Sequence, residues 1–365
     1  MAELKLENFA KIKNTSLDIK DITVIAGKPG TGKSYIMKIL YAINEGFFNV
    51  SSKVESTGFQ ANLLEKKLHS LEKENKYTKK QIKELEKLLE EIKKEQVTLD
   101  NLNIKLNESY SGILESIFGS LEQISNNFKV TLKKFMMVNK NGNIEISYDS
   151  KSEFFETLFV ETPLILEFKS FMNRNEGKTP YHIESLLNVL DKDYSIKDQK
   201  QKDFINSFSK LSKEIINGTI ESKGDTFTFK RNDEKTFDIV NASSGIKSIG
   251  LLQYLVVNNA LKKDSVLFWE EPEVHLHPTW QLKMVELFIE LMNNGVKIIF
   301  STHSPYMCDY LNALLKKQKL EKKVSFNLLS EDKEIVINTI LNEKNWDLLQ
   351  TELLGPLEEI MWEYV

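Results

Sequence analysis

The stretch GKPGTGKS at residues 27–34 joins small residues, a lysine and a serine at a spacing suited to phosphate chemistry. Its three glycines allow a tight turn that aims backbone N–H groups at an anion. Lys33 supplies a point charge for the terminal phosphates, and Ser34 offers Mg²⁺ a hydroxyl at the positive end of a helix. The match to GxxxxGK[ST] predicts an ATP site. The residues expected to contact the nucleotide are Gly27, Lys28, Pro29, Gly30, Thr31, Gly32, Lys33, Ser34 and Tyr35.

A second segment, SVLFWEEPE at residues 265–273, is an apolar run that ends in acids. In a site that hydrolyses a nucleotide, one carboxylate orients the shell of a metal ion and the next accepts a proton from the attacking water. We therefore expect Glu270 to bind Mg²⁺ and Glu271 to act as the general base. The alternative is an ordinary strand followed by an acidic turn.

A third segment, KIIFSTHS at residues 297–304, places a histidine after another apolar run. Because neighbouring parallel strands end at the same edge of a sheet, we expect His303 to contact the terminal phosphate of the nucleotide. His275 and His277 are spaced like a metal-binding pair. Without a third ligand, packing on the turn that follows the strand is the preferred interpretation.

The elements that must position these residues are indicated by the sequence around them. Residues 1–26 predict strands, the last of which ends at the glycine-rich turn, and residues 34–45 predict the helix that follows. Strand, turn and helix in this order are the context that the phosphate-binding motif requires.

The segment 60–106 shows a different pattern. Leucines and isoleucines recur at spacings of four and three, with lysine and glutamate between them, which is typical of a coiled coil. The pattern weakens at Asn75 and Thr78, so either one helix continues or two helices form an antiparallel hairpin. A single solvated amphipathic helix is the alternative to a paired coiled coil.

The rest of the chain gives weaker signals. A helix, two strands with the sequences VSFNLL and EIVINTI, and a helical end are expected after residue 310. The other candidates are strands at 128–138 and 143–149, helices at 152–173, 180–191 and 198–217, and a hairpin at 225–240.

Composition limits the partners and the location. The chain has 365 residues, a net charge of −4 and a single cysteine, Cys308. No global positive field attracts it to nucleic acid, so DNA binding would need a local basic patch. One cysteine excludes a disulfide within the chain. No apolar segment approaches the ~20 residues of a membrane span and no signal core begins the chain, so we expect a cytoplasmic protein without a membrane partner.

The order of these motifs resembles the ABC-type ATPases of the SMC, DNA-repair and OLD group. GKPGTGKS, NASSGIKS, LFWEEPEVHLHP and STHSP follow one another as in that group, over residues 1–45 and 225–315. The form EEPExHLHP followed by STHSP is especially similar to the OLD-type and related bacterial "AAA family" ATPases of phage-defence systems.

The resemblance implies a role for NASSGIKS at residues 241–248. The segment is similar to the ABC signature, so Ser243, Ser244 and Gly245 are expected to contact the γ-phosphate of ATP bound to a second copy of the chain. A serine at a helix N-terminus suits an anion, and the same serine also serves as an ordinary helix cap.

The sequence also departs from the family pattern. Glu270 stands where Asp is usual, and the extra methylene is expected to shift Mg²⁺ and slow turnover. Ala242 and Ile246 stand where transporters usually carry Leu and Gln, and no residue is identified for the Gln that follows the first lobe. The residues after 310 are too few for the Toprim nuclease domain of OLD nucleases, so any nuclease is expected on another chain.

These observations predict an α/β fold with an ABC-type P-loop ATPase head formed by residues 1–50 and 222–330. Residues 51–221 are expected to be a helical insertion with a coiled coil near 60–106, and residues 331–365 a C-terminal segment of the head or a partner-docking tail. We expect a homodimer that closes on ATP and reopens on hydrolysis. It would sense or regulate for a separate effector, a nuclease or toxin, in an antiphage or DNA-associated system.

Two alternatives stay open. One is a DNA-repair or chromosome-maintenance ATPase that itself binds duplex DNA. The other is the nucleotide-binding subunit of a transporter, against which EEPExHLHP and the long insertion argue.

Overall fold

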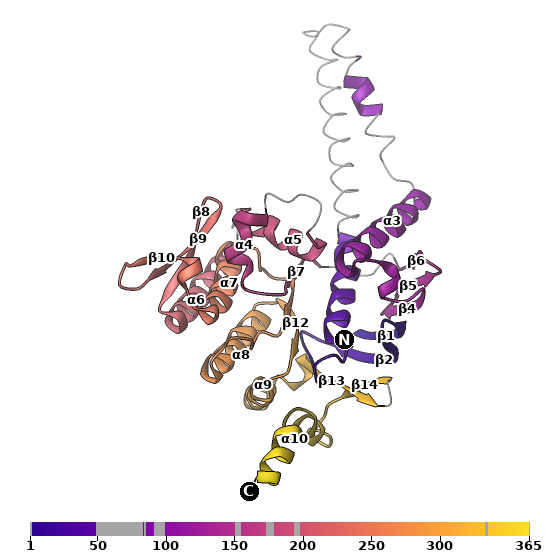
Figure 1. Ribbon diagram of the computed structural model, residues 1–365. Coiled ribbons are helices and arrows are strands. Elements are labelled where there is room, and N and C mark those ends of the chain that lie inside the picture. Colours follow the sequence, from indigo (N-terminus) through magenta and orange to yellow (C-terminus); the bar gives the residue numbers. More distant parts are fainter. Residues whose placement is uncertain are drawn as a thin grey trace.

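A central sheet organises the chain in this computed structural model (Figure 1). The structure describes residues 2–48, 83, 85–90, 99–149, 155–172, 179–192, 198–332 and 335–364. The strands of the central sheet are β3 (Ile22–Gly27), β7 (Thr157–Val160), β11 (Val266–Glu270), β12 (Lys297–Thr302), β13 (Val324–Asp332) and β14 (Ile335–Ile340). Their order across the sheet is β14-β13-β3-β12-β11-β7, and every neighbouring pair is parallel except β13 with β14.

The central strands are buried on both faces, as their nearly continuous apolar sequences predict. On β11, Leu267 and Trp269 pack into the core on one face of the sheet, whereas Phe268 packs into the core on the other. Alternate side chains therefore hold two layers against one sheet.

A second, antiparallel sheet covers one of these cores. Its order is β2-β1-β4-β5-β6, formed by β1 (Ala2–Phe9), β2 (Ile12–Ile19), β4 (Asn127–Leu132), β5 (Phe135–Lys140) and β6 (Asn143–Ser147). The helix at residues 33–48 and α3 (Leu99–Phe118) share this core with the sheet. Strands from the middle of the chain therefore complete a sheet that the first residues begin.

The remaining helices and a small sheet pack around the other core (Figure 1). The helices are α4 (Ile165–Met172), α5 (Tyr181–Leu190), α6 (Gln199–Ile216), α7 (Ser244–Val257), α8 (Pro278–Asn293), α9 (Pro305–Gln318) and α10 (Asp347–Tyr364). The small sheet contains β8 (Gly218–Lys223), β9 (Thr226–Arg231) and β10 (Thr236–Asp238). Among the described helices, none has the length and apolarity needed to cross a membrane.

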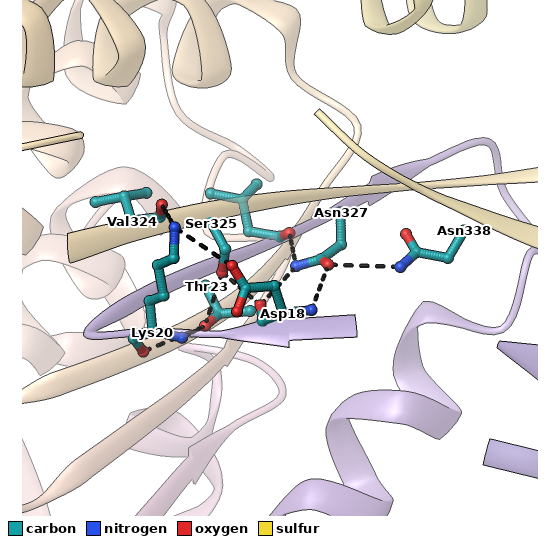
Figure 2. Close-up of polar contacts among 8 residues, drawn as sticks. Asp18, Lys20, Thr23, Val324, Ser325, Asn327 and Asn338 are labelled. Atoms are coloured by element: carbon teal, nitrogen blue, oxygen red, sulfur yellow. Dashed lines mark hydrogen bonds and ion pairs between the residues drawn. The ribbon is translucent and has the colours of Figure 1, made fainter. Parts of the chain in front are cut away.

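A buried polar network fixes the corner between β2 and β3 onto β13 and β14 (Figure 2). Asn327 is fully buried, and its Oδ1 accepts the Asp18 N–H at 3.0 Å. Its Nδ2 donates to the backbone oxygens of Asp18 and Val24 at 3.2 and 3.3 Å. Lys20 Nζ donates to the Val324 carbonyl at 3.1 Å. The network therefore sets how β13 lies along β3, the strand that leads into GKPGTGKS.

The α/β fold class is confirmed, as are the strands predicted within residues 1–26 and after residue 310. The single strand predicted at 128–138 is wrong: β4 and β5 are separated by a turn at Lys133, whose φ is +54°. The helix predicted at 152–173 is also wrong at its start, because β7 lies there and pairs with β11. Burial in a parallel sheet overrides the local pattern in that segment.

The insertion predicted at 51–221 contains strands as well as helices, so it is not wholly helical. Besides α3 to α6, it supplies β4, β5 and β6 to the antiparallel sheet and β7 to the central sheet. The hairpin predicted at 225–240 is β9 and β10, which β8 extends to three strands. Most of the coiled coil predicted at 60–106 lies outside the described residues. The division into domains stays a prediction.

Candidate functional site

The candidate site lies at the carboxyl edge of the central sheet, where β3, β12 and β11 end side by side. Glu270 on β11 is in register with Ser301 on β12, and Thr302 on β12 with Ala26 on β3. The segments that leave these strands therefore meet, as ligand-binding segments of parallel sheets do. This arrangement brings together GKPGTGKS, the acidic turn and His303.

The phosphate-binding loop is shaped by its glycines. Gly27, Gly30 and Gly32 have φ angles of +148°, +78° and +90°, which side chains disfavour. A Cβ on Gly27 would lie 2.2 Å from the carbonyl oxygen of Leu329 on β13. Thr31 is buried, and its hydroxyl donates to the Lys28 carbonyl at 2.9 Å. The close packing at Gly27 and the hydrogen bond of Thr31 therefore stabilise the conformation of the loop.

Lys33 projects from the first turn of the helix at residues 33–48 and is buried. Its Nζ donates to the carbonyls of Gly27 and Lys28 at 3.0 Å each, and it lies 3.0 Å from Nε2 of His303. Burial lowers the pKa of Lys33 to about 8, and the charges of the nearby glutamates act in the opposite direction. An anion bound here would favour the charged form of Lys33 in the same way.

Glu270 and Ser34 place two side-chain oxygen groups beside each other. Burial raises the pKa of Glu270 to about 7, against the charge of Lys38 and a hydrogen bond with Ser34. Oε1 of Glu270 is buried and has no hydrogen-bond partner among the described residues. A buried carboxylate oxygen with unused acceptor capacity beside a hydroxyl suits a hard cation. Ser34 and Glu270 therefore fit the Mg²⁺ ion that a nucleotide brings.

Glu271 follows β11 in a strained backbone conformation, with φ at +44°. Its N–H donates to the Ser301 carbonyl at 3.1 Å, and its Oε1 lies 2.9 Å from Nε2 of His303. Burial and then the charge of Lys33 lower the pKa of His303, while Glu271 acts in the opposite direction. The strained turn thus presents the Glu271 carboxylate to the same point as His303 and Lys33.

Glu273 is a site residue for which the sequence analysis predicted no role. Its Oε1 accepts the Thr302 hydroxyl at 2.8 Å and the His303 N–H at 2.6 Å. Burial raises the pKa of Glu273. This carboxyl group ties the turn after β11 to the end of β12 and so positions His303. The signal for Glu273 in the sequence was its place as the third acid of EEPE at residues 270–273.

Glu161, directly after β7, is a second residue that the sequence analysis missed. Its carboxylate lies 2.9 Å from Nε2 of His182 and 3.0 Å from Nζ of Lys38, which is on the helix of the phosphate-binding loop. The hydrogen bond with His182 is the main cause that lowers the pKa of Glu161 to about 2. No motif marks this acid, because only the sheet topology brings it to the site.

A cavity of about 480 Å³ opens above these groups. Loop residues form one wall, and Glu271 and His303 form another. The third wall contains Ala10, Lys11 and Gln123, none of which the sequence analysis predicted. Tyr35 also lines the cavity and stacks on Phe118 with ring centroids 5.3 Å apart.

The predicted signature residues lie elsewhere on the chain. Ser243 is the N-cap of α7, and its Oγ accepts the Ile246 N–H at 3.4 Å. Gly245 is buried, and a Cβ there would lie 3.1 Å from the ring of Trp280. Neither these residues nor Ser244 lines the cavity. Within one chain, this segment is therefore separate from the phosphate-binding loop.

A buried ion pair holds the first turn of α7. Lys247 Nζ lies 2.5 Å from a carboxylate oxygen of Glu167 on α4, and their side chains are 6% and 19% exposed. Lys247 also donates to the Val240 carbonyl at 3.3 Å. The signature segment is thus fixed to the helix that follows β7 and Glu161.

His275 and His277, the two other histidines of the motifs, belong to the segment that leads into α8. His277 is the N-cap of α8, and its Nδ1 accepts the Thr279 N–H at 3.3 Å. His275 occupies the turn before it with φ at +65°. The helix cap accounts for His277 as the packing interpretation expects.

Residues 22–309 match the family model described as "AAA domain, putative AbiEii toxin, Type IV TA system". This range contains the phosphate-binding loop, the acidic turn, the signature segment and His303. No curated protein matches the chain with significance.

Solved structures show distant similarity. The SMC head domain from Thermotoga maritima is 11% identical, with a TM-score of 0.43, covering 93% of this chain and 98% of that one. An Smc head domain with an extended coiled coil, bound to the C-terminal domain of ScpA derived from Pyrococcus furiosus, is 12% identical, with a TM-score of 0.47 and coverages of 96% and 99%. The ADP conformation of an ATP-binding cassette of an ABC transporter is 12% identical, with a TM-score of 0.39 and coverages of 94%.

Proposed function

This chain belongs to the family of AAA domains matched over residues 22–309, and from that premise we propose that it is an Mg²⁺-dependent ATPase. The observation that carries the proposal is that Lys33 Nζ and Glu271 Oε1 both lie close to Nε2 of His303, at 3.0 and 2.9 Å, with Ser34 and Glu270 beside them. Cation, imidazole, base and metal ligands then surround one point at the edge of the sheet.

The loop holds the triphosphate in this proposal. Backbone N–H groups of residues 30–34 and the positive end of the following helix face the phosphates. Lys33 donates to the terminal phosphate oxygens in place of the carbonyls it now contacts. Ser34 and Glu270 hold Mg²⁺, which when bound neutralises charge on the β- and γ-phosphates.

Hydrolysis follows from the same geometry. A water molecule attacks the γ-phosphorus, the bond from that phosphorus to the bridging oxygen breaks, and ADP and phosphate result. Glu271 accepts the proton that the water loses. Lys33 stabilises charge on the transferred group, and His303 contacts that group from β12. Glu273 acts on the reaction by holding the His303 backbone.

We also propose that the active form is a homodimer. Ser243 is exposed and lies outside the cavity of its own chain, so its contact with a phosphate requires a second copy. Two apolar side chains follow the site turns and are exposed: Val274 by 41% and Tyr306 by 60%. In this proposal the second copy covers both side chains.

The biological role that we propose is regulation of a separate effector, a nuclease or toxin, in an antiphage or DNA-associated system. This rests on the family match and on the resemblance of EEPExHLHP and STHSP to phage-defence ATPases. Copurification of the full chain with the products of its neighbouring genes tests it. Capture of a nuclease or toxin with ATP present supports the proposal, and capture of a membrane permease contradicts it.

The alternative, direct binding of duplex DNA, predicts a different result. Neutralisation of phosphates makes such binding fall steeply with salt. A mobility-shift assay at about 50 and 200 mM salt would then show a loss of affinity on the order of 10³-fold, as several phosphate contacts require.

The ATPase itself is tested by calorimetry on Lys33→Ala, with Lys13→Ala, at an exposed position on β2, as a matched control. We expect Lys33→Ala to lower ATP affinity by roughly 100-fold, because a charge-assisted contact with the phosphates is lost. The control should bind ATP like the unmodified chain. Equal affinity in both variants contradicts the proposed site.

A further inference from the structure

One wall of the nucleotide cavity has no part in the proposed hydrolysis. It is formed by Gln123, with Ala10 and Lys11 in the turn between β1 and β2. Gln123 ends a short 3₁₀ helix, η1 (Leu121–Gln123), whose first residue, Leu121, and C-cap, Ile124, are buried. The cavity therefore extends from the phosphate-binding loop to a second, separately anchored segment.

The backbone of Gln123 is fixed beside this turn. The N–H of Ala10 donates to the carbonyl of Ile124, the next residue along the chain. The side chain of Gln123 lies against Gly119 at the end of α3, where its Nε2 and Oε1 would be 3.4 and 3.6 Å from an added Cβ. The amide is thus held at the cavity wall by a defined backbone.

The amide of Gln123 is also available to a ligand. It is exposed, and within the described part of the chain it has no hydrogen-bond partner. Lys11, which also lines the cavity, pairs with Glu331 at 3.0 Å, and the ring of Tyr35 stacks on Phe118. The amide of Gln123 therefore supplies an uncommitted donor and acceptor at the cavity.

We infer that Gln123 contacts the hydrogen-bonding edge of the purine base of the bound nucleotide. The inference rests on the proposed ATP site, since Lys33 and Ser34, which would place the phosphates, line the same cavity as Gln123. A glutamine amide carries one acceptor oxygen and a donor NH₂. It pairs with N6–H and N1 of adenine, and after rotation of the amide with O6 and N1–H of guanine.

The chemistry of the amide gives a sharp test. Gln123→Glu replaces the donor with a second acceptor. A carboxylate accepts two hydrogen bonds from N1–H and N2–H of guanine, but faces the N1 lone pair of adenine. Titration of the full chain with ATP and with GTP, each with Mg²⁺, should show the GTP-to-ATP affinity ratio rise at least tenfold in Gln123→Glu. The new charge repels the phosphates of ATP and of GTP equally, so this effect cancels in the ratio of the two affinities.

Two controls separate this inference from the proposed ATPase. Gln123→Leu, similar in size and without hydrogen-bonding groups, should bind both nucleotides more weakly by an equal factor. Glu122→Gln, an exposed neighbour on the same η1, should change neither affinity. An unchanged ratio in Gln123→Glu, with both nucleotides still bound, overturns the role of Gln123 alone. Failure of the unmodified chain to bind any triphosphate overturns the ATPase proposal instead.

Discussion

Nε2 of His303 lies 2.9 Å from Oε1 of Glu271, although 32 positions separate the two residues in the chain. The same nitrogen lies 3.0 Å from Nζ of Lys33. One ring nitrogen cannot accept from the ammonium and donate to the carboxylate in a single protonation state. Burial, and then the charge of Lys33, lower the pKa of His303, which favours the neutral ring. In the proposed reaction Glu271 is therefore the group that accepts the proton from water.

This relationship predicts the effect of Glu271→Gln. The amide keeps the size of the side chain but cannot accept a proton, so turnover should fall by roughly 100-fold or more while ATP affinity is retained. Phosphate release and calorimetry measure the two quantities. Because bound ATP is no longer cleaved, the dimer should persist in gel filtration with ATP and Mg²⁺.

Glu270→Gln is the matched variant for that experiment. It removes the proposed ligand of Mg²⁺, so the Mg²⁺ concentration needed for half-maximal ATP binding should rise. If Glu270→Gln instead gives tight ATP binding with slow turnover, and Glu271→Gln raises the half-maximal Mg²⁺ concentration, the two roles are the reverse of those proposed.

Ser243→Arg tests the proposed contact across a dimer. The substitution places a bulky charged side chain at the N-terminus of α7, outside the cavity that Lys33 and Ser34 form. ATP should bind with little change, whereas ATP-dependent dimerisation and hydrolysis should be lost together. A variant that stays monomeric with ATP and still hydrolyses at the unmodified rate would show that Ser243 is only a helix cap.

Mixing Ser243→Arg with Lys33→Ala sharpens that result. A mixed dimer contains one composite site with both defects and one with neither, so partial recovery of ATPase activity is expected. Each variant alone provides the control. If mixed dimers are shown to form and ATPase activity does not recover, the result contradicts the proposal that one intact composite site at the interface can function alone.

The Glu167–Lys247 pair predicts a non-additive effect on stability. Lys247→Met leaves the partly buried Glu167 carboxylate without its cation, which should lower the free energy of unfolding by about 3 kcal/mol. Replacing both, as Glu167→Leu with Lys247→Met, should recover most of the loss because no unpaired charge remains. Urea unfolding measures both. Equal losses in the single and double variants would show that the ion pair does not link α4 to α7.

Asn327→Leu should destabilise the chain through the network in Figure 2. Asn327 is fully buried, and its loss leaves the N–H of Asp18 and two carbonyl oxygens without this partner. The cost should be about 1–3 kcal/mol, the range for an unsatisfied buried polar group. Comparing the thermal unfolding of Asn327→Leu with that of Asn14→Leu, a substitution at an exposed position on β2, tests this cost. Similar unfolding temperatures in both variants would contradict the prediction.

Glu161 predicts a defined acid dependence. Its hydrogen bond with His182, and then Lys38, lower its pKa from 4.5 to about 2 in the folded chain. A depressed folded pKa means that the unfolded chain binds more protons, so this stability is present above pH 4.5 and lost as pH falls toward 2. Glu161→Gln should remove that part of the loss in acid unfolding followed by circular dichroism. An unchanged acid midpoint in the variant would contradict the pairing.

The predictions that agreed with the structure depend on contiguous residues. GKPGTGKS requires a strand before it and a helix after it, and β3 and the helix at residues 33–48 lie there. The apolar runs before Glu270 and His303 become β11 and β12, because such runs suit strands buried on both faces. The strand β7 was missed since its four residues carry too little pattern to distinguish a strand from a helix.

The sequence by itself determined that a phosphate-binding loop, two acids and a histidine each follow an apolar strand. Those signals are local, because the backbone and its nearest neighbours set them. Only the tertiary structure decided that Gln123 lines the cavity and that Glu161 contacts the helix of the phosphate-binding loop through Lys38. Glu161 arrives through the pairing of β7 with β11, and Gln123 through the hydrogen bond of Ala10 to Ile124. Such contacts join distant segments through burial and shared hydrogen bonds, so no short motif records them.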